Sequence, residues 1–150
     1  MPRTTNEICT EIEIEASAQR VWQVLTDFPA YSQWNSSVFG LQGEMKVGGR
    51  LVIGLRPTGV PLLRFPVRVL RVEPERELRW RGRFIVSSLF AGEHALIIQP
   101  LGDSRVRFIQ REAYTGLLAS MFLFVAGASN RRIFERMNRG LKVRAEQTPL

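Results

Sequence analysis

The chain has 150 residues, of which 45% are hydrophobic, and its formal net charge at pH 7 is +7. This length predicts a single domain over residues 1–150, and the lone cysteine, Cys9, excludes an internal disulfide. No apolar stretch near the start has the form of a signal peptide. The apolar run from Leu117 to Ala128 falls short of the ~20 residues of a spanning helix, so we expect a cytoplasmic protein.

The positive charge is spread along alternating segments instead of being gathered in one tract. Arg79, Arg81 and Arg83 alternate with apolar residues, and near the start Glu11 and Glu13 do the same. Such alternation is typical of a sheet with one solvent face, on which Arg and Glu pair across strands. Because no aromatic residues for base stacking interleave with the arginines, we expect no nucleic-acid partner.

The first elements are a strand and two short helices. Residues 8–15 alternate cleanly and predict a strand. Ser17 stands at an N-cap position, and the residues from Val21 to Phe28 have helical spacing. Pro29 ends this helix, and residues 30–35 predict a second short helix or a turn.

The middle of the chain is strand-like and is punctuated by Gly and Pro. Turn residues separate six predicted strands, at residues 38–42, 50–56, 63–72, 77–84, 93–99 and 105–114.

The last element is a long helix with Thr115 as its N-cap, reaching about Ala145. One stripe of this helix steps by three or four through Leu118, Phe122, Val125, Ser129, Ile133, Met137 and Leu141. The order of elements predicts an α+β helix-grip architecture: a seven-stranded curved antiparallel sheet around the C-terminal helix, with two short helices after the first strand. Such a sheet closes incompletely, so a cavity can remain between helix and sheet.

The segment from Gly92 to Gly116 reads as a hairpin with unusual polar residues on its apolar face. A turn at residues 101–103 would place His94 opposite Gln110, with Glu112 diagonal to His94. The predicted interior therefore has an apolar body and one polar end, as small-molecule pockets do.

Three roles are open for this polar group. It can orient a polar group of an apolar ligand, it can be an internal hydrogen-bonded network that holds the hairpin register, or His94 and Glu112 can act as a general acid–base pair. One histidine and one cysteine cannot build a typical zinc site, and no phosphate-binding glycine loop occurs, so we expect no metal and no cofactor.

Several segments together resemble one superfamily. They are "IEIEASAQRVWQVLTDFPAYSQWN", "VRVLRVEPERELRWRG", "GEHALIIQP", "REAYTGLL" and "MNRGLKVRAE". In this order they are similar to the START-like, or SRPBCC, superfamily with the helix-grip fold, within its polyketide cyclase/dehydrase-type branch. The resemblance covers nearly the whole chain and implies a cavity with a small hydrophobic ligand, lipid- or polyketide-like, but no particular reaction.

We therefore expect a protein that binds a small hydrophobic molecule between the sheet and the C-terminal helix. An alternative is a polyketide cyclase or dehydratase that uses Glu112 and His94. The candidate ligand contacts are Trp80, Phe84, His94, Phe108, Gln110, Glu112, Tyr114 and Phe122.

The start of the long helix carries a second apolar face, formed by Leu117, Met121 and Phe124. Three explanations are open: an adaptor surface for a membrane or a protein partner, helped by the basic residues downstream; a homodimer interface; or coverage by the loops at residues 54–63 and 85–91.

Overall fold

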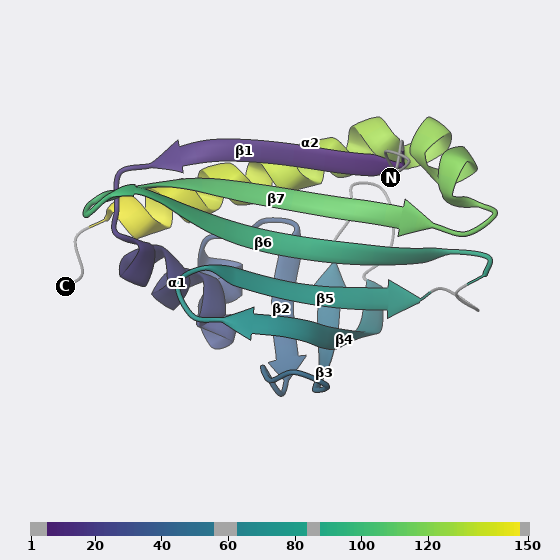
Figure 1. The fold of residues 1–150 in the computed structure, drawn as a ribbon, viewed down its shortest axis with the longest axis horizontal. Helices are drawn as coiled ribbons and strands as arrows, with labels where there is room; N and C mark the ends of the chain where they lie inside the picture. The colour runs from purple at the N-terminus through teal and green to yellow at the C-terminus, as the bar shows by residue number, and fades with distance from the viewer. Residues whose placement is uncertain (1–5, 56–62, 84–87, 148–150) are drawn as a thin grey trace.

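The fold is a seven-stranded antiparallel sheet that curls around one long helix, α2 (Figure 1). The computed structural model describes residues 6–55, 63–83 and 88–147. The strand order is β1-β7-β6-β5-β4-β3-β2, so the first and second strands form the two edges. The strands are β1 (Glu7–Ile14), β2 (Val38–Gly43), β3 (Arg50–Leu55), β4 (Leu63–Glu73), β5 (Glu77–Arg83), β6 (Ala91–Gly102) and β7 (Arg105–Thr115). This architecture confirms the predicted helix-grip fold.

Two short helices follow β1, as predicted. In α1 (Ala18–Thr26), the side-chain oxygen of Ser17 accepts a hydrogen bond from the backbone N–H of Arg20, at 3.1 Å. The 3₁₀ helix η1 (Phe28–Gln33) takes Pro29 into its first turn, where the missing N–H costs no hydrogen bond.

The long helix α2 (Ala119–Glu146) begins later than predicted, and Thr115 is not its N-cap. Thr115 is the last residue of β7, and the chain then turns at Gly116, where φ is +101°. A Cβ at Gly116 would lie 2.5 Å from the carbonyl oxygen of Leu89, so only glycine fits this turn. The N–H groups of Leu117 and Leu118 donate to the carbonyl oxygens of Ser88 and Leu89 instead of to a capping side chain.

The predicted inward stripe of α2 is right in its second half, whereas in its first half Phe122 packs inward and Val125 and Ser129 do not. Met137 and Leu141 are buried against the sheet, whereas Val125 is 77% exposed and Ser129 also faces solvent. Phe134, which the stripe omitted, is buried instead. Apolar residues occur on two faces of the first turns, and spacing alone does not decide which face packs on the sheet.

The β6–β7 hairpin has the predicted faces but a different register. β6 runs to Gly102, which pairs with Arg105 beyond a bulge, so the turn lies at residues 103–104 instead of 101–103. The pairing is thereby shifted by two residues, and His94 lies directly opposite Glu112. A shift of two keeps every side chain on its predicted face, because strand side chains alternate with a period of two.

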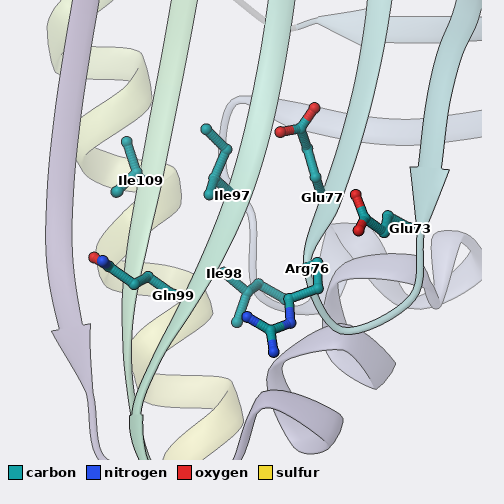
Figure 2. A pocket seen from close by; sticks show the side chains of 7 residues that line it. All are labelled: Glu73, Arg76, Glu77, Ile97, Ile98, Gln99 and Ile109. Carbon is teal, nitrogen blue, oxygen red and sulfur yellow. The ribbon is translucent and has the colours of Figure 1, made fainter.

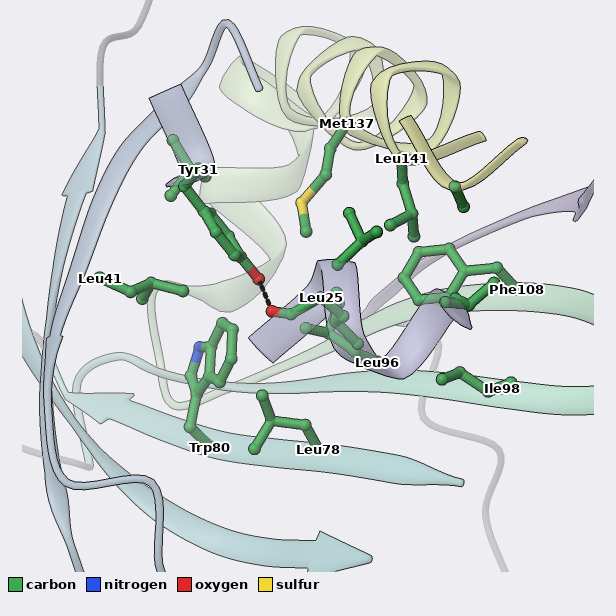
Figure 3. Packing of buried hydrophobic residues seen from close by; sticks show 14 of the residues in the cluster. Leu25, Tyr31, Leu41, Leu78, Trp80, Leu96, Ile98, Phe108, Met137 and Leu141 are labelled. Carbon is green, nitrogen blue, oxygen red and sulfur yellow. Dashed lines mark hydrogen bonds between the residues drawn. The ribbon is translucent and has the colours of Figure 1, made fainter. Parts of the chain in front are cut away.

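The main core fills the space between the sheet, α1, η1 and the second half of α2 (Figure 3). Tyr31 is fully buried, and its hydroxyl donates to the carbonyl oxygen of Leu25 (Figure 3). Leu78, Leu96 and Leu141 are fully buried around it. This packing fixes α1 and η1 against the sheet.

The outer face of the sheet is charged, and its pairing is uneven. On β1 and β7, Arg105 pairs with Glu13, as the alternating pattern predicted. On β3, β4 and β5, however, Arg50, Arg68 and Arg81 lie directly opposite one another in one row. Within the described residues none of these three guanidinium groups has an ion-pair partner. Like charges in direct opposition are unfavourable, so this row costs stability.

Candidate functional site

The polar residues of the hairpin meet on the inner face of the sheet. The His94 Nδ1 atom lies 2.5 Å from Glu112 Oε2, and its Nε2 atom lies 2.9 Å from Gln110 Oε1. His94 is 8% exposed and Gln110 is 1% exposed. Both ring nitrogens of His94 are therefore engaged by protein oxygens.

The network continues from Gln110 into α2 and β1. The Gln110 side-chain nitrogen donates to Asn138 Oδ1 at 2.8 Å and to the carbonyl oxygen of Phe134 at 3.4 Å. Asn138 Nδ2 donates to the hydroxyl of Thr10 at 2.9 Å, and this hydroxyl donates to the carbonyl oxygen of Gln110 at 3.5 Å. The sheet and α2 are thus joined by hydrogen bonds in the middle of an otherwise apolar interface.

These contacts determine the hydrogens on His94. A backbone carbonyl only accepts, so the Gln110 amide must present its nitrogen to Phe134 and its oxygen to His94. Nε2 must then carry a hydrogen. Nδ1 faces a carboxylate oxygen, which also accepts, so this contact needs a second hydrogen between the two atoms. The geometry thus places one hydrogen on Nε2 and another between Nδ1 and the Glu112 carboxyl group.

The charge state of Glu112 is set by opposing effects. Burial raises its pKa and is the largest single effect. The charge of His94 and the hydrogen bonds from His94 and Tyr114 together outweigh burial, so the pKa lies below its usual value. Glu112 is therefore ionised at neutral pH. Its side chain is 19% exposed, against 10% for His94, so it is the more accessible member of the pair.

Tyr114 and Asn130 extend the network beyond Glu112. Asn130 Nδ2 donates to the Tyr114 hydroxyl. Burial, followed by the negative charge of Glu112, raises the pKa of Tyr114, so the phenol stays neutral and remains a hydrogen-bond donor.

Aromatic rings enclose His94 on two sides. The Trp80 ring stacks on the imidazole with centroids 5.3 Å apart and planes at 24°. The Phe134 ring meets it edge-on, with centroids 4.9 Å apart. The stacked indole restricts the imidazole ring to one orientation.

The polar network separates the main core from a smaller apolar cluster at the start of α2. In this smaller cluster, Tyr114 and Phe122 have ring centroids 4.9 Å apart, and Phe90 packs on both. Its buried members are Ile8, Tyr114, Ala119 and Phe134. The interior therefore has two apolar compartments with a polar layer between them.

A pair of glycines leaves the inner face of the sheet without side chains of its own next to this layer. Gly82 on β5 lies opposite Gly92 on β6, two pairs beyond Trp80 and His94. A Cβ at Gly92 would lie 3.4 Å from Glu112 Oε1 and 3.6 Å from the Tyr114 ring, which is ordinary contact, whereas a Cβ at Gly82 would lie 3.3 Å from Val67 Cγ1. The carboxylate and the phenol ring therefore lie over Gly92, and Val67 covers Gly82.

The glycine pair was not among the residues predicted from the sequence, although a signal was present. Gly82 has the strand parity of Trp80, and Gly92 has that of His94. Glycines on the inward positions of two adjacent predicted strands indicate missing volume in the interior. Asn138 was also omitted, although it stands directly beside the inward-facing Met137.

The structure brings most of the other predicted site residues together. Trp80, His94, Gln110, Glu112 and Tyr114 form one connected group, and Phe122 packs on Tyr114. Phe108 does not join this group: it is fully buried in the main core, on the far side from Trp80 (Figure 3). Phe84 lies outside the described residues.

A separate open pocket of about 340 Å³ lies on the outer face of the sheet, away from α2 (Figure 2). Ile97 and Ile109, which pair across β6 and β7, form its apolar part, and Glu77 is buried at one side. The remaining lining residues are Glu73, Arg76, Ile98 and Gln99. This pocket is not connected with the His94 group, because the sheet lies between them.

Neither a metal centre nor a membrane span is found in the part of the chain that the structure describes. No group of three or more His, Cys, Asp or Glu residues there could hold a metal ion. No helix there, α2 included, is both long and apolar enough to cross a membrane.

Comparisons with known proteins agree with the fold. Residues 5–146 match the family model described as polyketide cyclase / dehydrase and lipid transport. No curated protein matches the chain. The crystal structure of the Zhui aromatase/cyclase from Streptomyces sp. R1128 is similar, with a TM-score of 0.76, 15% identity and 93% of each chain covered.

Two further solved structures share the same architecture. A START superfamily protein from Mycobacterium smegmatis has a TM-score of 0.71 and 21% identity, with 94% of this chain and 97% of that chain covered. Truncated norcoclaurine synthase from Thalictrum flavum has a TM-score of 0.66 and 14% identity, with 95% and 94% covered. At these identities the likeness concerns the fold alone.

Proposed function

Because the chain belongs to the polyketide cyclase / dehydrase and lipid transport family, within the START-like superfamily, we propose that it binds a small hydrophobic molecule on the inner face of its sheet. The proposed site lies over Gly92, beside Trp80, Tyr114 and Glu112. The ligand is lipid- or polyketide-like, and the smaller apolar cluster supplies its hydrophobic surroundings.

One observation carries this proposal: a partly exposed carboxylate lies over a glycine of the sheet in an otherwise aromatic environment. An apolar surrounding with a few convergent polar groups is characteristic of small-molecule sites. His94 and Gln110 already satisfy each other and their neighbours, so their role in this site is to position Glu112. Glu112 and Tyr114 are the groups that a polar ligand atom would meet.

The test is to add a side chain at Gly92. A Cβ at Gly92 makes only ordinary contacts, and the further atoms of a leucine would press on Glu112 and Tyr114, so thermal unfolding must first verify that Gly92→Leu is folded. Gly40→Leu on edge strand β2 is the matched control, because a Cβ there meets nothing within 4 Å. We expect the affinity for the neutral fluorescent probe N-phenyl-1-naphthylamine to fall at least about tenfold in Gly92→Leu, which corresponds to about 1.4 kcal/mol, and to stay unchanged in Gly40→Leu. Equal affinities in both variants would reject this site.

Native mass spectrometry of gently purified protein, followed by organic extraction, would identify a retained ligand. The same preparation of Gly92→Leu provides the comparison. An apolar adduct present in the parent protein and in Gly40→Leu, and lost from Gly92→Leu, supports the proposed site.

A second candidate is an enzyme of the cyclase or dehydratase type, favoured by the ionised and accessible Glu112. The ionised carboxylate can accept a proton from a carbon next to a carbonyl group, leaving an enolate, although its lowered pKa makes it a weaker base than an ordinary glutamate. His94 has no free nitrogen, so it would be a positioning residue in this reaction. In deuterium oxide, NMR would detect exchange of the acidic protons of an acetoacetyl thioester. An acceleration of about 10²-fold that Glu112→Gln removes supports the enzyme; no acceleration by the parent protein rejects it for this substrate class.

A further inference from the structure

The start of α2 carries an apolar surface that nothing in the described structure covers. Leu117, Phe124 and Val125 are 83%, 92% and 77% exposed, and Met121 is 58% exposed. We call these four residues the apolar knob. Coverage by the loops at residues 54–63 and 85–91 was one explanation for their hydrophobicity, and residues 56–62 and 84–87 of those loops lie outside the described residues.

The knob does not belong to the core or to the proposed ligand site. On α2 the side chains of Phe134, Met137 and Leu141 face the sheet, and Met121 and Val125 project from the opposite side of the same helix. Phe122, which does pack on the smaller cluster, lies between them in sequence. The first turns of α2 are thus apolar on the face toward the sheet and on the face toward solvent. A helix that is apolar on both faces is typically covered on both faces.

Basic residues continue the same outward surface along the helix. Arg132, Arg136 and Arg139 are exposed, and none of them has an ion pair within the described residues. With a rise of 1.5 Å per residue, Arg132 lies about 12 Å beyond Phe124. Glu135 is the one acidic residue in this stretch of α2, and it is half-buried. The outward face therefore changes from apolar to cationic along the helix axis.

We infer that this face of α2 docks on a lipid bilayer that contains anionic lipid. The knob would enter the interfacial region, and the arginines would lie among the headgroups. The alternative occupant, a second copy of this chain, fits less well, because a dimer contact through the knob would leave the arginines of both copies without an acidic partner in a protein of net charge +7. An anionic bilayer satisfies the apolar and the cationic parts at once.

This docking would place the smaller apolar cluster, and with it the proposed ligand site, next to the membrane. Phe122 links the two, because it is adjacent to Met121 in the chain and packs on Tyr114. The inference itself does not require the proposed function, since the exposed residues and the arginines carry it alone.

The test is cosedimentation with sucrose-loaded vesicles, either of phosphatidylcholine alone or of phosphatidylcholine and phosphatidylglycerol at 7:3. We expect binding to the mixed vesicles at 50 mM salt, at least tenfold weaker binding to phosphatidylcholine alone, and a marked loss at 500 mM salt. Comparable binding to both vesicles, or no binding to either, overturns the inference.

Two pairs of variants separate the knob from general electrostatics. F124S/V125S should lower vesicle binding at least tenfold, whereas Val47→Ser, a valine 67% exposed in the β2–β3 turn, should not. R132E/R136E should abolish binding, whereas R50E/R68E, with the same change in net charge on the outer face of the sheet, should retain most of it. Equal losses within either pair overturn the inference, because binding would then reflect overall hydrophobicity or charge.

Two controls complete the experiment. All these positions are exposed, so unchanged thermal unfolding verifies that the variants are folded. N-phenyl-1-naphthylamine binding to F124S/V125S should equal that of the parent protein, which distinguishes failure of docking from failure of the ligand site. A concentration-dependent dimer that F124S/V125S dissociates, without vesicle binding, would overturn the inference in favour of the second copy.

Discussion

The pair formed by His94 and Glu112 should be strongly coupled in stability. Replacing His94 by Leu leaves the Glu112 carboxylate with Tyr114 alone, and leaves the Gln110 side-chain oxygen without its donor. Breaking a buried ion pair from one side costs about 3–5 kcal/mol, because an uncompensated charge remains. Since the Glu112 side chain is 19% exposed, water offsets part of this cost, and we expect about 3 kcal/mol for His94→Leu.

The double variant should cost less than the sum of the two single variants. H94L/E112L removes both charges together, and replacing a buried pair with apolar residues is often nearly neutral. Because Gln110 still loses its donor, we expect the double variant to cost about 4 kcal/mol against about 3 kcal/mol for each single variant, which is a coupling of about 2 kcal/mol, and a loss of about 10 °C in melting temperature for each single variant. Urea unfolding at pH 7, followed by circular dichroism, measures the free energy of unfolding of the parent protein, the two single variants and the double variant.

The pair Arg79–Glu93 is the control, because its atoms are 3.1 Å apart on the outer face and its side chains are 34% and 39% exposed. Exposed pairs contribute about 0–1 kcal/mol, so this cycle should show little coupling. A coupling for His94 and Glu112 below about 0.5 kcal/mol would refute the reasoning, since independent sites add within that error.

Three further predictions concern other features of the molecule. Because the pKa of Glu112 is lowered in the folded state, its contribution to stability is complete above about pH 4.5 and is lost as the pH falls through the folded pKa; the difference in unfolding free energy between the parent protein and Glu112→Gln should therefore shrink only below that pH, and a constant difference would contradict the ion pair. Arg68→Glu should raise the free energy of unfolding by about 0.2–1 kcal/mol, because it removes the repulsion between Arg50, Arg68 and Arg81. Arg105→Glu should lower it, because the new carboxylate would face the glutamates of β1. If both variants shift the urea midpoint in the same direction relative to the parent protein, this interpretation is contradicted. Gly116→Ala should cost at least about 1–3 kcal/mol, because its Cβ would overlap a backbone carbonyl at positive φ, while Gly40→Ala, with open space around it, should cost less in the same assay.

The faces of the strands could be predicted from the sequence, but their partners could not. Alternation with a period of two placed His94, Gln110 and Glu112 on the inner face, and the structure confirms this. The turn at residues 103–104, combined with the bulge before Gly102, shifts the register by two residues. A register shift of two residues leaves the inward and outward alternation unchanged, so the hydrophobic pattern of the sequence cannot distinguish the two registers. The register nevertheless decides whether His94 lies directly opposite Glu112.

The orientation of α2 could be predicted only where the helix is amphipathic. In its second half, the buried Met137 and Leu141 are flanked by charged residues, and the inward face is unambiguous. In its first half, both Val125 and Phe122 are apolar, and only tertiary packing chooses Phe122 for the interior. Residue spacing therefore does not identify the inward face of α2 where the solvent-exposed face is also hydrophobic.

The polar layer across the interior also has a consequence for motion. Among the residues that the structure describes, the main core contains twenty-one buried hydrophobic residues, whereas the cluster beyond the layer contains four. Such a division creates two cooperative units of unequal stability, and the smaller unit can open while the larger one remains folded. Amide hydrogens near Gly92 and Tyr114 should then exchange with solvent through local opening, and those near Leu96 only through global unfolding. Breathing of the smaller unit would give a bulky apolar molecule a way in and out that leaves the rest of the fold intact.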